Sequence, residues 1–183
     1  LFGEEYTRSF FICEPANNLV HREVLEPDGI SFRSHRPADE KDSEFLASED
    51  NWSRFTMART GPDGCLYVVD MYRLVLEHPE WIPQPMIEHL DLRAGSDHGR
   101  IYRITREVPG DPTAAASRGI ANLERMGRAE LLAELGSPNG WRRDTAQRLL
   151  IERSEGNRES VSGALRSLLA ATPPAPPWHA IQL

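Results

Sequence analysis

Short apolar runs separated by turn-forming residues mark the first part of the chain. Aromatic and β-branched residues gather in these runs, and Pro, Gly and Asp lie between them. This arrangement is typical of β-strands joined by turns. The segments predicted as strands are residues 10–13, 19–25, 30–32, 44–48, 65–69 and 99–104.

The turn Gly61-Pro62-Asp63-Gly64 provides the clearest local prediction. Pro in its second position and Gly in its fourth favour a type I turn. The nearly continuous apolar run that follows, residues 65–69, predicts a strand buried on both faces. Residues 99–104 alternate apolar and polar side chains, which predicts a half-buried strand.

The last part of the chain has the period of α-helices instead. Apolar residues recur there at three- and four-residue spacing. They are Leu131, Leu132 and Leu135, then Trp141, Thr145, Leu149 and Leu150, then Val161, Ala164, Leu165, Leu168 and Leu169. Short paired helices of this kind predict an α-solenoid, whose units bury their apolar faces against stacked neighbours.

Charge and turn chemistry place a boundary between the two parts. Residues 1–107 contain 20 of the 28 acidic residues, and the segment 108–113 combines Pro, Gly and Asp as a linker does. We therefore predict a β domain over 1–107, a linker over 108–118 and a helical domain over 119–183. The short strands fit a sandwich, a barrel or a propeller equally well.

Composition narrows the class of protein. No run approaches the roughly 18–20 apolar residues that a membrane-spanning helix needs. The net charge of −7 argues against binding to nucleic acid. Cys13 and Cys65 are too few for a disulfide framework and do not have the spacing of zinc ligands. Because the chain begins with Leu1 and ends in an apolar run, we expect an excerpt of a longer protein, the alternative being a complete small protein.

Ordered motifs in residues 1–106 together resemble one family. They include Phe11-Ile12-Cys13-Glu14-Pro15, Asp50-Asn51-Trp52, Glu77-His78-Pro79 and the long segment 61–73. The chain resembles the PVC-type membrane-bound dehydrogenase family, whose members often carry a haem-binding domain. The segment 136–153 is similar to the HEAT repeats that follow in this family.

The resemblance implies a long protein exported to the periplasm or cell envelope. Its fold class would be mixed, with the terminal all-β blades of a β-propeller over residues 1–107 and the start of an all-α HEAT-like solenoid over 119–183. Its partners would be the remaining blades and repeats of the same polypeptide and a sugar-like substrate. A c-type haem would lie elsewhere in the polypeptide, because this sequence has no Cys-x-x-Cys-His. The resemblance leaves open whether a quinone or calcium ion binds.

The densest polar cluster follows the predicted strand 65–69. It contains Asp70, Tyr72, Arg73, Glu77 and His78. Residues at which a strand leaves a sheet often face a ligand site, since loops on a rigid scaffold carry function. Asp70 would bind a cation or orient a base, Arg73 would hold an anionic group, and the other three are candidate ligand-binding residues. The alternative is that Asp70 and Arg73 pair with each other or cap the strand end.

His21 is the candidate general base that would take a proton as hydride leaves the substrate. The alternative is a partly exposed histidine of a strand. The other histidines lack the spacing of metal ligands, so no metal site is predicted.

Two functions follow as hypotheses. In the first, the propeller oxidises a sugar- or alcohol-like substrate, and electrons pass to a c-type haem domain outside this chain. In the alternative, the chain is a non-catalytic binding or scaffolding module for polysaccharide or protein partners. In both cases we expect the isolated chain to leave sheet edges and an apolar helix face uncovered, which favours aggregation.

Overall fold

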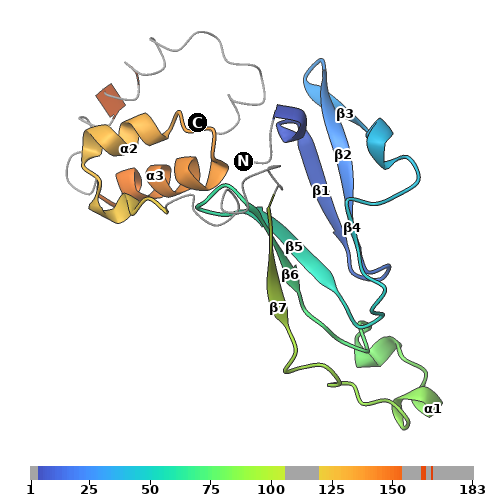
Figure 1. Ribbon diagram of the computed structural model, residues 1–183. Coiled ribbons are helices and arrows are strands. Elements are labelled where there is room, and N and C mark those ends of the chain that lie inside the picture. Colours follow the sequence, from blue (N-terminus) through green and yellow to red (C-terminus); the bar gives the residue numbers. More distant parts are fainter. Residues whose placement is uncertain (1–3, 106–119, 154–161, 164–165, 167–183) are drawn as a thin grey trace, which may run out of the picture. The chain divides into compact units, whose positions relative to one another are not determined.

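The computed structural model describes residues 4–105, 120–153, 162–163 and 166 of the 183-residue chain (Figure 1). The chain divides into two compact units, one of residues 1–61 and 65–116 and the other of residues 62–64 and 117–183. The predicted linker 108–118 and most of the third predicted helix, 161–169, lie outside the described residues.

The first unit contains two antiparallel sheets. The first sheet has the order β1 (Ser9–Glu14), β2 (Leu19–Asp28) and β3 (Ser31–His35), and the two-residue β4 (Leu46–Ala47) pairs with the start of β2. Two 3-10 helices accompany it, η1 (Glu4–Tyr6) and η2 (Ala38–Glu40). The turn after β2 lies at Gly29, whose φ of 63° suits glycine, so β2 continues through Asp28 beyond its predicted end.

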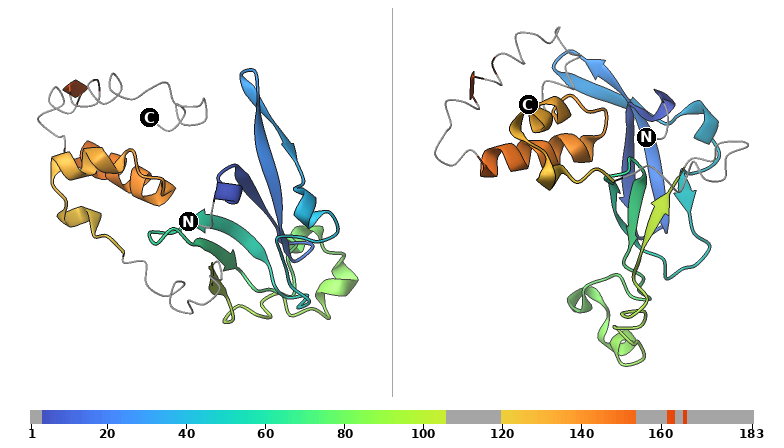
Figure 2. Two further views of the ribbon diagram at one scale, coloured as in Figure 1. Left: turned by 45° about the horizontal axis from the view of Figure 1, so that its top comes forward. Right: turned by 60° about the vertical axis from the view of Figure 1, so that its left-hand side comes forward.

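The second sheet has the order β5 (Phe55–Thr60), β6 (Leu66–Asp70) and β7 (Arg100–Ile104) (Figure 2). Gly61 N–H donates to the Cys65 carbonyl at 2.8 Å, which closes a three-residue loop ending at Gly64 with φ 81°. Glycine adopts this left-handed conformation without strain, which explains its place at the end of the loop. Between β6 and β7 lie η3 (Pro79–Trp81) and the short α1 (Gln84–Ile87).

The inner faces of the two sheets share one hydrophobic core. It consists of Val20, Phe55, Leu66 and Val68, with Phe11 and Phe45 among the side chains packed against it. The prediction of propeller blades is therefore wrong: over the described residues the two small sheets pack on each other, and they form no closed barrel or propeller. The prediction that residues 65–69 are buried on both faces is also wrong, because Tyr67 and Val69 are only half-buried on the opposite side of β6.

The second unit buries a small helical core. The α2 helix (Arg128–Glu134) packs against α3 (Gly140–Glu152), and Leu123 of η4 (Leu123–Arg125) completes the core. Asn139 caps α3 by accepting a hydrogen bond from Trp141 N–H at 3.0 Å. The prediction of a HEAT-like solenoid is wrong for the part that the structure describes, since its two helices, α2 and α3, close their core on η4 and do not form a series of repeats. None of the described helices is long and apolar enough to cross a membrane.

Candidate functional site

Asp70 closes the end of β6 as a hydrogen-bond acceptor. The residue is 1% exposed, and its Oδ1 accepts from the backbone N–H groups of Arg54 at 2.7 Å and Tyr72 at 2.9 Å. Its Oδ2 accepts from the Ser53 hydroxyl at 3.0 Å and lies 3.7 Å from Arg100 Nε. The carboxylate is thus engaged by the protein itself, which favours the capping alternative over a cation ligand or a base.

The Arg73 side chain is also hydrogen-bonded to the protein. Its Nη1 donates to the backbone carbonyls of Met71, Tyr72 and Gly95 at 3.1, 2.9 and 2.9 Å. Its backbone N–H donates to the Trp52 carbonyl at 2.8 Å. The guanidinium therefore fixes the chain around Tyr72, and this role favours a structural function over the binding of an anion.

Tyr72 has the backbone conformation that these contacts impose. Its φ is 53°, a left-handed value that is a true outlier for a bulky side chain. A Cβ atom at Gly95, whose own φ is 89°, would lie 2.7 Å from the Tyr72 carbonyl oxygen, so the two backbones approach closely. A strained backbone conformation of this kind persists only where the surrounding contacts hold it in place. Such residues are frequent at functional sites.

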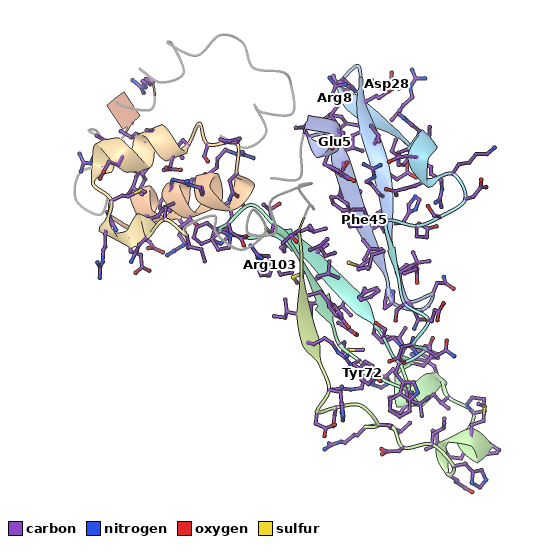
Figure 3. All side chains as sticks on the ribbon, in the orientation of Figure 1. Glu5, Arg8, Asp28, Phe45, Tyr72 and Arg103 are labelled. Carbon is purple, nitrogen blue, oxygen red and sulfur yellow. The ribbon has the colours of Figure 1, made fainter. Side chains whose placement is uncertain are left out.

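The Tyr72 ring lies in a group of polar and aromatic side chains that we call the tyrosine cluster: Asp50, Trp52, Tyr72, His98 and Arg100. The Tyr72 hydroxyl donates to Asp50 Oδ2 at 2.9 Å, and the Arg100 guanidinium lies 4.2 Å from the ring centroid. The rings of Trp52 and His98 are each 5.9 Å from it. Figure 3 shows Tyr72 just beyond the end of the second sheet, where the segments before β5, after β6 and before β7 meet.

Hydrogen bonding sets the protonation of the cluster. The bond to Asp50 raises the pKa of the Tyr72 phenol above its usual value. The pKa of Asp50 is lowered, first by the Trp52 N–H and then by the Tyr72 hydroxyl. His98 likewise lowers the pKa of the neighbouring Asp97, to which it is bonded at 2.7 Å. At neutral pH the cluster therefore offers a protonated phenol at Tyr72 and an ionised carboxylate at Asp50, which suits binding through hydrogen bonds.

We expect Tyr72→Gly to be more stable than Tyr72→Ala. Both variants lose the ring, but only glycine adopts the left-handed backbone without strain. The midpoint of urea unfolding should be higher for the glycine variant by about 0.5 M. Tyr67 in β6 is the matched control, because glycine weakens an extended strand and the order should reverse there. Equal midpoints for the two Tyr72 variants would contradict the left-handed assignment.

Glu77 and His78 lie apart from the cluster in the chain that leads to η3. Both are exposed, and His78 Nδ1 accepts from the Glu80 N–H at 3.3 Å as the N-cap of that short helix. The structure thus brings Tyr72 together with Asp70 and Arg73, as the sequence predicted, and places Glu77 and His78 elsewhere.

His21 lies on the face of β2 that points away from the core. Its Nδ1 is 2.7 Å from Glu44 Oε2 and its Nε2 is 2.7 Å from Glu23 Oε1. The hydrogen bonds to Glu23 and then Glu44 raise the pKa of His21. The pKa of Glu44 is lowered by Arg36 and by His21, and that of Glu23 by His21. These contacts hold the imidazole inside a charge network of the first sheet.

Stability should depend on pH through His21. Because its pKa is higher in the folded than in the unfolded state, the protonated ring stabilises the fold fully below about pH 6.5, and the contribution is lost as pH rises through the folded pKa. We expect His21→Gln to cost about 1–2 kcal/mol at pH 6 and clearly less at pH 9. Urea unfolding at both pH values measures this, with the exposed His89→Gln as control. If the loss of stability in His21→Gln were the same at both pH values, protonation of His21 would not stabilise the fold.

The cysteines and the other side chains able to bind a metal form neither a disulfide nor a metal-ligand cluster over the described residues. Cys13 and Cys65 form no disulfide with each other, and burial raises the pKa of the Cys13 thiol. Within the described ranges no three His, Cys, Asp or Glu side chains come together as a metal site.

Most of the tyrosine cluster escaped the sequence analysis. Asp50 and Trp52 belong to a motif that carried the family resemblance, but no role was assigned to them. His98 and Arg100 lie 26 and 28 positions after Tyr72, so only the pairing of β7 with β6 brings them near. A usable signal was that each of these residues lies within a predicted strand or within four positions of one.

Comparison with known proteins places the chain in a family without assigning an activity. No curated protein and no solved structure matches it. The model of a family described as a domain of unknown function, DUF7133, matches residues 1–108, which is more than half of the chain. The chain therefore belongs to the DUF7133 family.

Proposed function

We propose that the chain is a non-catalytic binding module whose ligand is a polysaccharide and whose binding site is the tyrosine cluster. One observation carries the proposal. Asp70 and Arg73, the strongest catalytic candidates of the sequence, direct their polar atoms to the protein, and in doing so they hold Tyr72 in a strained conformation among other rings.

The chemistry of the cluster suits a sugar. A sugar ring has an apolar face of C–H groups and a rim of hydroxyls, so it needs aromatic surface beside a few placed polar groups. Trp52 and Tyr72 supply aromatic surface and are each half-buried. Asp50 accepts hydrogen bonds from hydroxyls, and Arg100, which is 41% exposed in its side chain, donates them.

A glycan array of neutral and acidic oligosaccharides, followed by calorimetry with the strongest binder, tests the proposal. We expect Trp52→Ala and Tyr72→Phe to weaken binding by tenfold or more and about threefold, respectively, since aromatic contact contributes more than one hydroxyl. Trp81→Ala is the matched control, because Trp81 is 74% exposed and belongs to η3 outside the cluster. Absence of any binder, or equal loss with Trp81→Ala, would overturn the proposal.

An exported dehydrogenase of the PVC type is the second candidate for the longer protein. The motifs that carry this resemblance lie in residues 1–106, within the range 1–108 that the family model matches. In this proposal the longer protein oxidises a sugar- or alcohol-like substrate in the periplasm or cell envelope. Covalent haem c does not fit this chain, because its cysteines, Cys13 and Cys65, form no Cys-x-x-Cys-His. The haem would have to be held by residues outside it.

Turnover of the native-length protein separates the two candidates. Dye-linked oxidation of sugars, together with the absorption bands of haem c, would support the dehydrogenase. His21→Ala in that protein then tests the proposed base. Loss of activity under conditions in which the variant is still folded, together with an altered pH profile, would assign catalysis to this chain, whereas full activity would keep it a binding module.

A further inference from the structure

Asn18, in the turn between β1 and β2, holds the loop that leads from β4 to β5. Only 8% of this residue is exposed, and its side-chain Nδ2 donates to the carbonyls of Asp50 and Ser53, both at 2.8 Å. The Asn18 carbonyl accepts from the Ser48 N–H at 3.0 Å. One residue of the first sheet therefore fixes the loop at three points, which lie before, at and after the position of Asp50.

An amide side chain suits this place better than any other. Its NH₂ group carries two hydrogens, one for each carbonyl, whereas a carboxylate of the same shape would bring further acceptors to them. The backbone of Asn18 has a φ of 58°, a left-handed value that Asn adopts more readily than most residues. The pairing of β2 with β4 begins at the next residue and fixes the turn.

The two partners in the central hydrogen bond of the tyrosine cluster are held by different contacts. Tyr72 is fixed from the second sheet, where the Asp70 carboxylate accepts from its backbone N–H at 2.9 Å. In the described part of the chain, the Asp50 carbonyl accepts from the Asn18 amide and from the Ser53 N–H of its own loop. The bond between the Asp50 carboxylate and the Tyr72 hydroxyl therefore requires both sets of contacts.

Trp52, in the same loop, does not depend on Asn18 in this way. Its carbonyl accepts from the Arg73 N–H at 2.8 Å, which ties it to the second sheet directly. Loss of the Asn18 amide should therefore release Asp50 and leave the aromatic side chains in place.

We propose that Asn18 is a positioning residue of the tyrosine cluster. Its amide holds the Asp50 backbone so that the Asp50 carboxylate meets the Tyr72 hydroxyl and is oriented for a ligand. Binding groups need such support, because a site whose supporting contacts are loose loses its productive geometry. The effect of Asn18 on ligand binding rests on the proposed function, whereas its effect on the Tyr72 hydroxyl does not.

The Tyr72 phenol reports this contact without any ligand. The bond to Asp50 raises the pKa of the phenol, so losing the bond should lower it toward its ordinary value. Asn18→Gly removes the amide and tolerates the left-handed backbone. Titration of the full 183-residue chain, followed by ¹³C NMR of ring-labelled tyrosine, measures the change, and Tyr72→Phe assigns the signal. Asn17→Gly is the matched control, because Asn17 is exposed in the same turn.

Binding of the strongest glycan from the array separates positioning from general support of the fold. Asn18→Gly should weaken binding about three- to tenfold, as the loss of one hydrogen bond does. In the Asp50→Ala background the same change should have no further effect, because the carboxylate that Asn18 positions is then absent. A merely structural role would weaken binding by the same factor in both backgrounds.

The two measurements distinguish failure of this inference from failure of the proposed function. Circular dichroism checks that each variant is folded, and Asn18→Ser, which keeps one donor, should give smaller changes of the same sign if the glycine variant is unfolded. An unchanged pKa of Tyr72, or equal loss of binding in both backgrounds, would overturn the positioning role. If wild type bound no glycan while the pKa of Tyr72 fell in Asn18→Gly, the positioning role would stand and the proposed ligand would be wrong.

Discussion

Asp70→Ala is expected to destabilise the first unit by about 3–5 kcal/mol, because one side chain accepts three hydrogen bonds in a buried position. Removing it leaves the Arg54 and Tyr72 N–H groups and the Ser53 hydroxyl without their acceptor. Arg54 and Ser53 are themselves buried, at 9 and 2% exposure, so water cannot replace the carboxylate at low cost. The midpoint of urea unfolding measures the loss of stability. The dependence of the unfolding free energy on urea concentration shows whether unfolding remains two-state.

The conservative variant Asp70→Asn should cause a smaller loss of stability than Asp70→Ala. Its amide oxygen still accepts from the Arg54 and Tyr72 N–H groups, and its NH₂ can donate to the Ser53 hydroxyl, which is able to accept. We therefore expect a loss of only about 1–2 kcal/mol. Asp97→Ala is the control, because its side chain is 80% exposed. If Asp70→Ala were no worse than Asp97→Ala, the carboxylate would not hold the strand end, and a ligand-binding role for Asp70 would gain support.

Arg22→Ala is expected to cost about 3–5 kcal/mol for a different reason, the loss of the cation from a buried ion pair. Arg22 is 3% exposed, and its Nε lies 2.7 Å from Oε1 of Glu40, which is 8% exposed. Its Nη2 contacts both oxygens of Asp39 at 2.9 and 3.0 Å, and the guanidinium lies 4.6 Å from the Tyr6 ring centroid. Truncation leaves the Glu40 carboxylate buried without its partner.

The double variant Arg22→Met with Glu40→Leu separates charge from packing. Replacing both charges with apolar groups of similar volume removes the uncompensated carboxylate, so we expect stability to return to within about 1–2 kcal/mol of wild type. Arg33→Ala is the matched control, because its ion pair with Asp28 is exposed and little change is expected. If the double variant were as unstable as Arg22→Ala, packing rather than buried charge would explain the loss.

Local structure followed closely from the sequence where local chemistry decides it. The predicted strands 10–13 and 19–25 are confirmed as parts of β1 and β2, and the predicted strands 30–32 and 65–69 are confirmed as β3 and β6 except at their first residues, Ile30 and Cys65. Their apolar and β-branched residues favour strands, and the glycines at 29 and 64 supply the left-handed turns between them. The predicted helices are confirmed as α2 and α3. Leucines recur there at helical spacing, which is again a local pattern.

β5 was missed because its pattern is weak. Only Phe55 of its six residues is buried, and the pairing with β6 shifts register between Phe55 and Met57, which breaks the alternation that a sequence can show. Without β5, the second sheet was unrecognisable as a three-stranded unit, and the short strands stayed compatible with several β architectures.

For the candidate site as well, the sequence predicted the position of the residues and not their contacts. The cluster 70–73 was predictable, because polar residues directly after an apolar strand lie at a sheet end. The roles of its members were not, since the sequence does not show whether Asp70 accepts from a ligand or from the Arg54 N–H. The partners of Tyr72, from Asp50 to Arg100, come from segments that meet only when β5, β6 and β7 pair.

By itself the sequence determined most of the strands, the helices α2 and α3, the loop at 61–64 and the position of the polar cluster, because these depend on contacts between residues close in the chain. The tertiary structure alone decided that two sheets share a core instead of forming propeller blades, and that Asp70 and Arg73 hold the backbone. The physical reason is that burial and hydrogen-bond partners are set by long-range packing. An apolar strand face or a carboxylate is compatible with many neighbours until the fold supplies one.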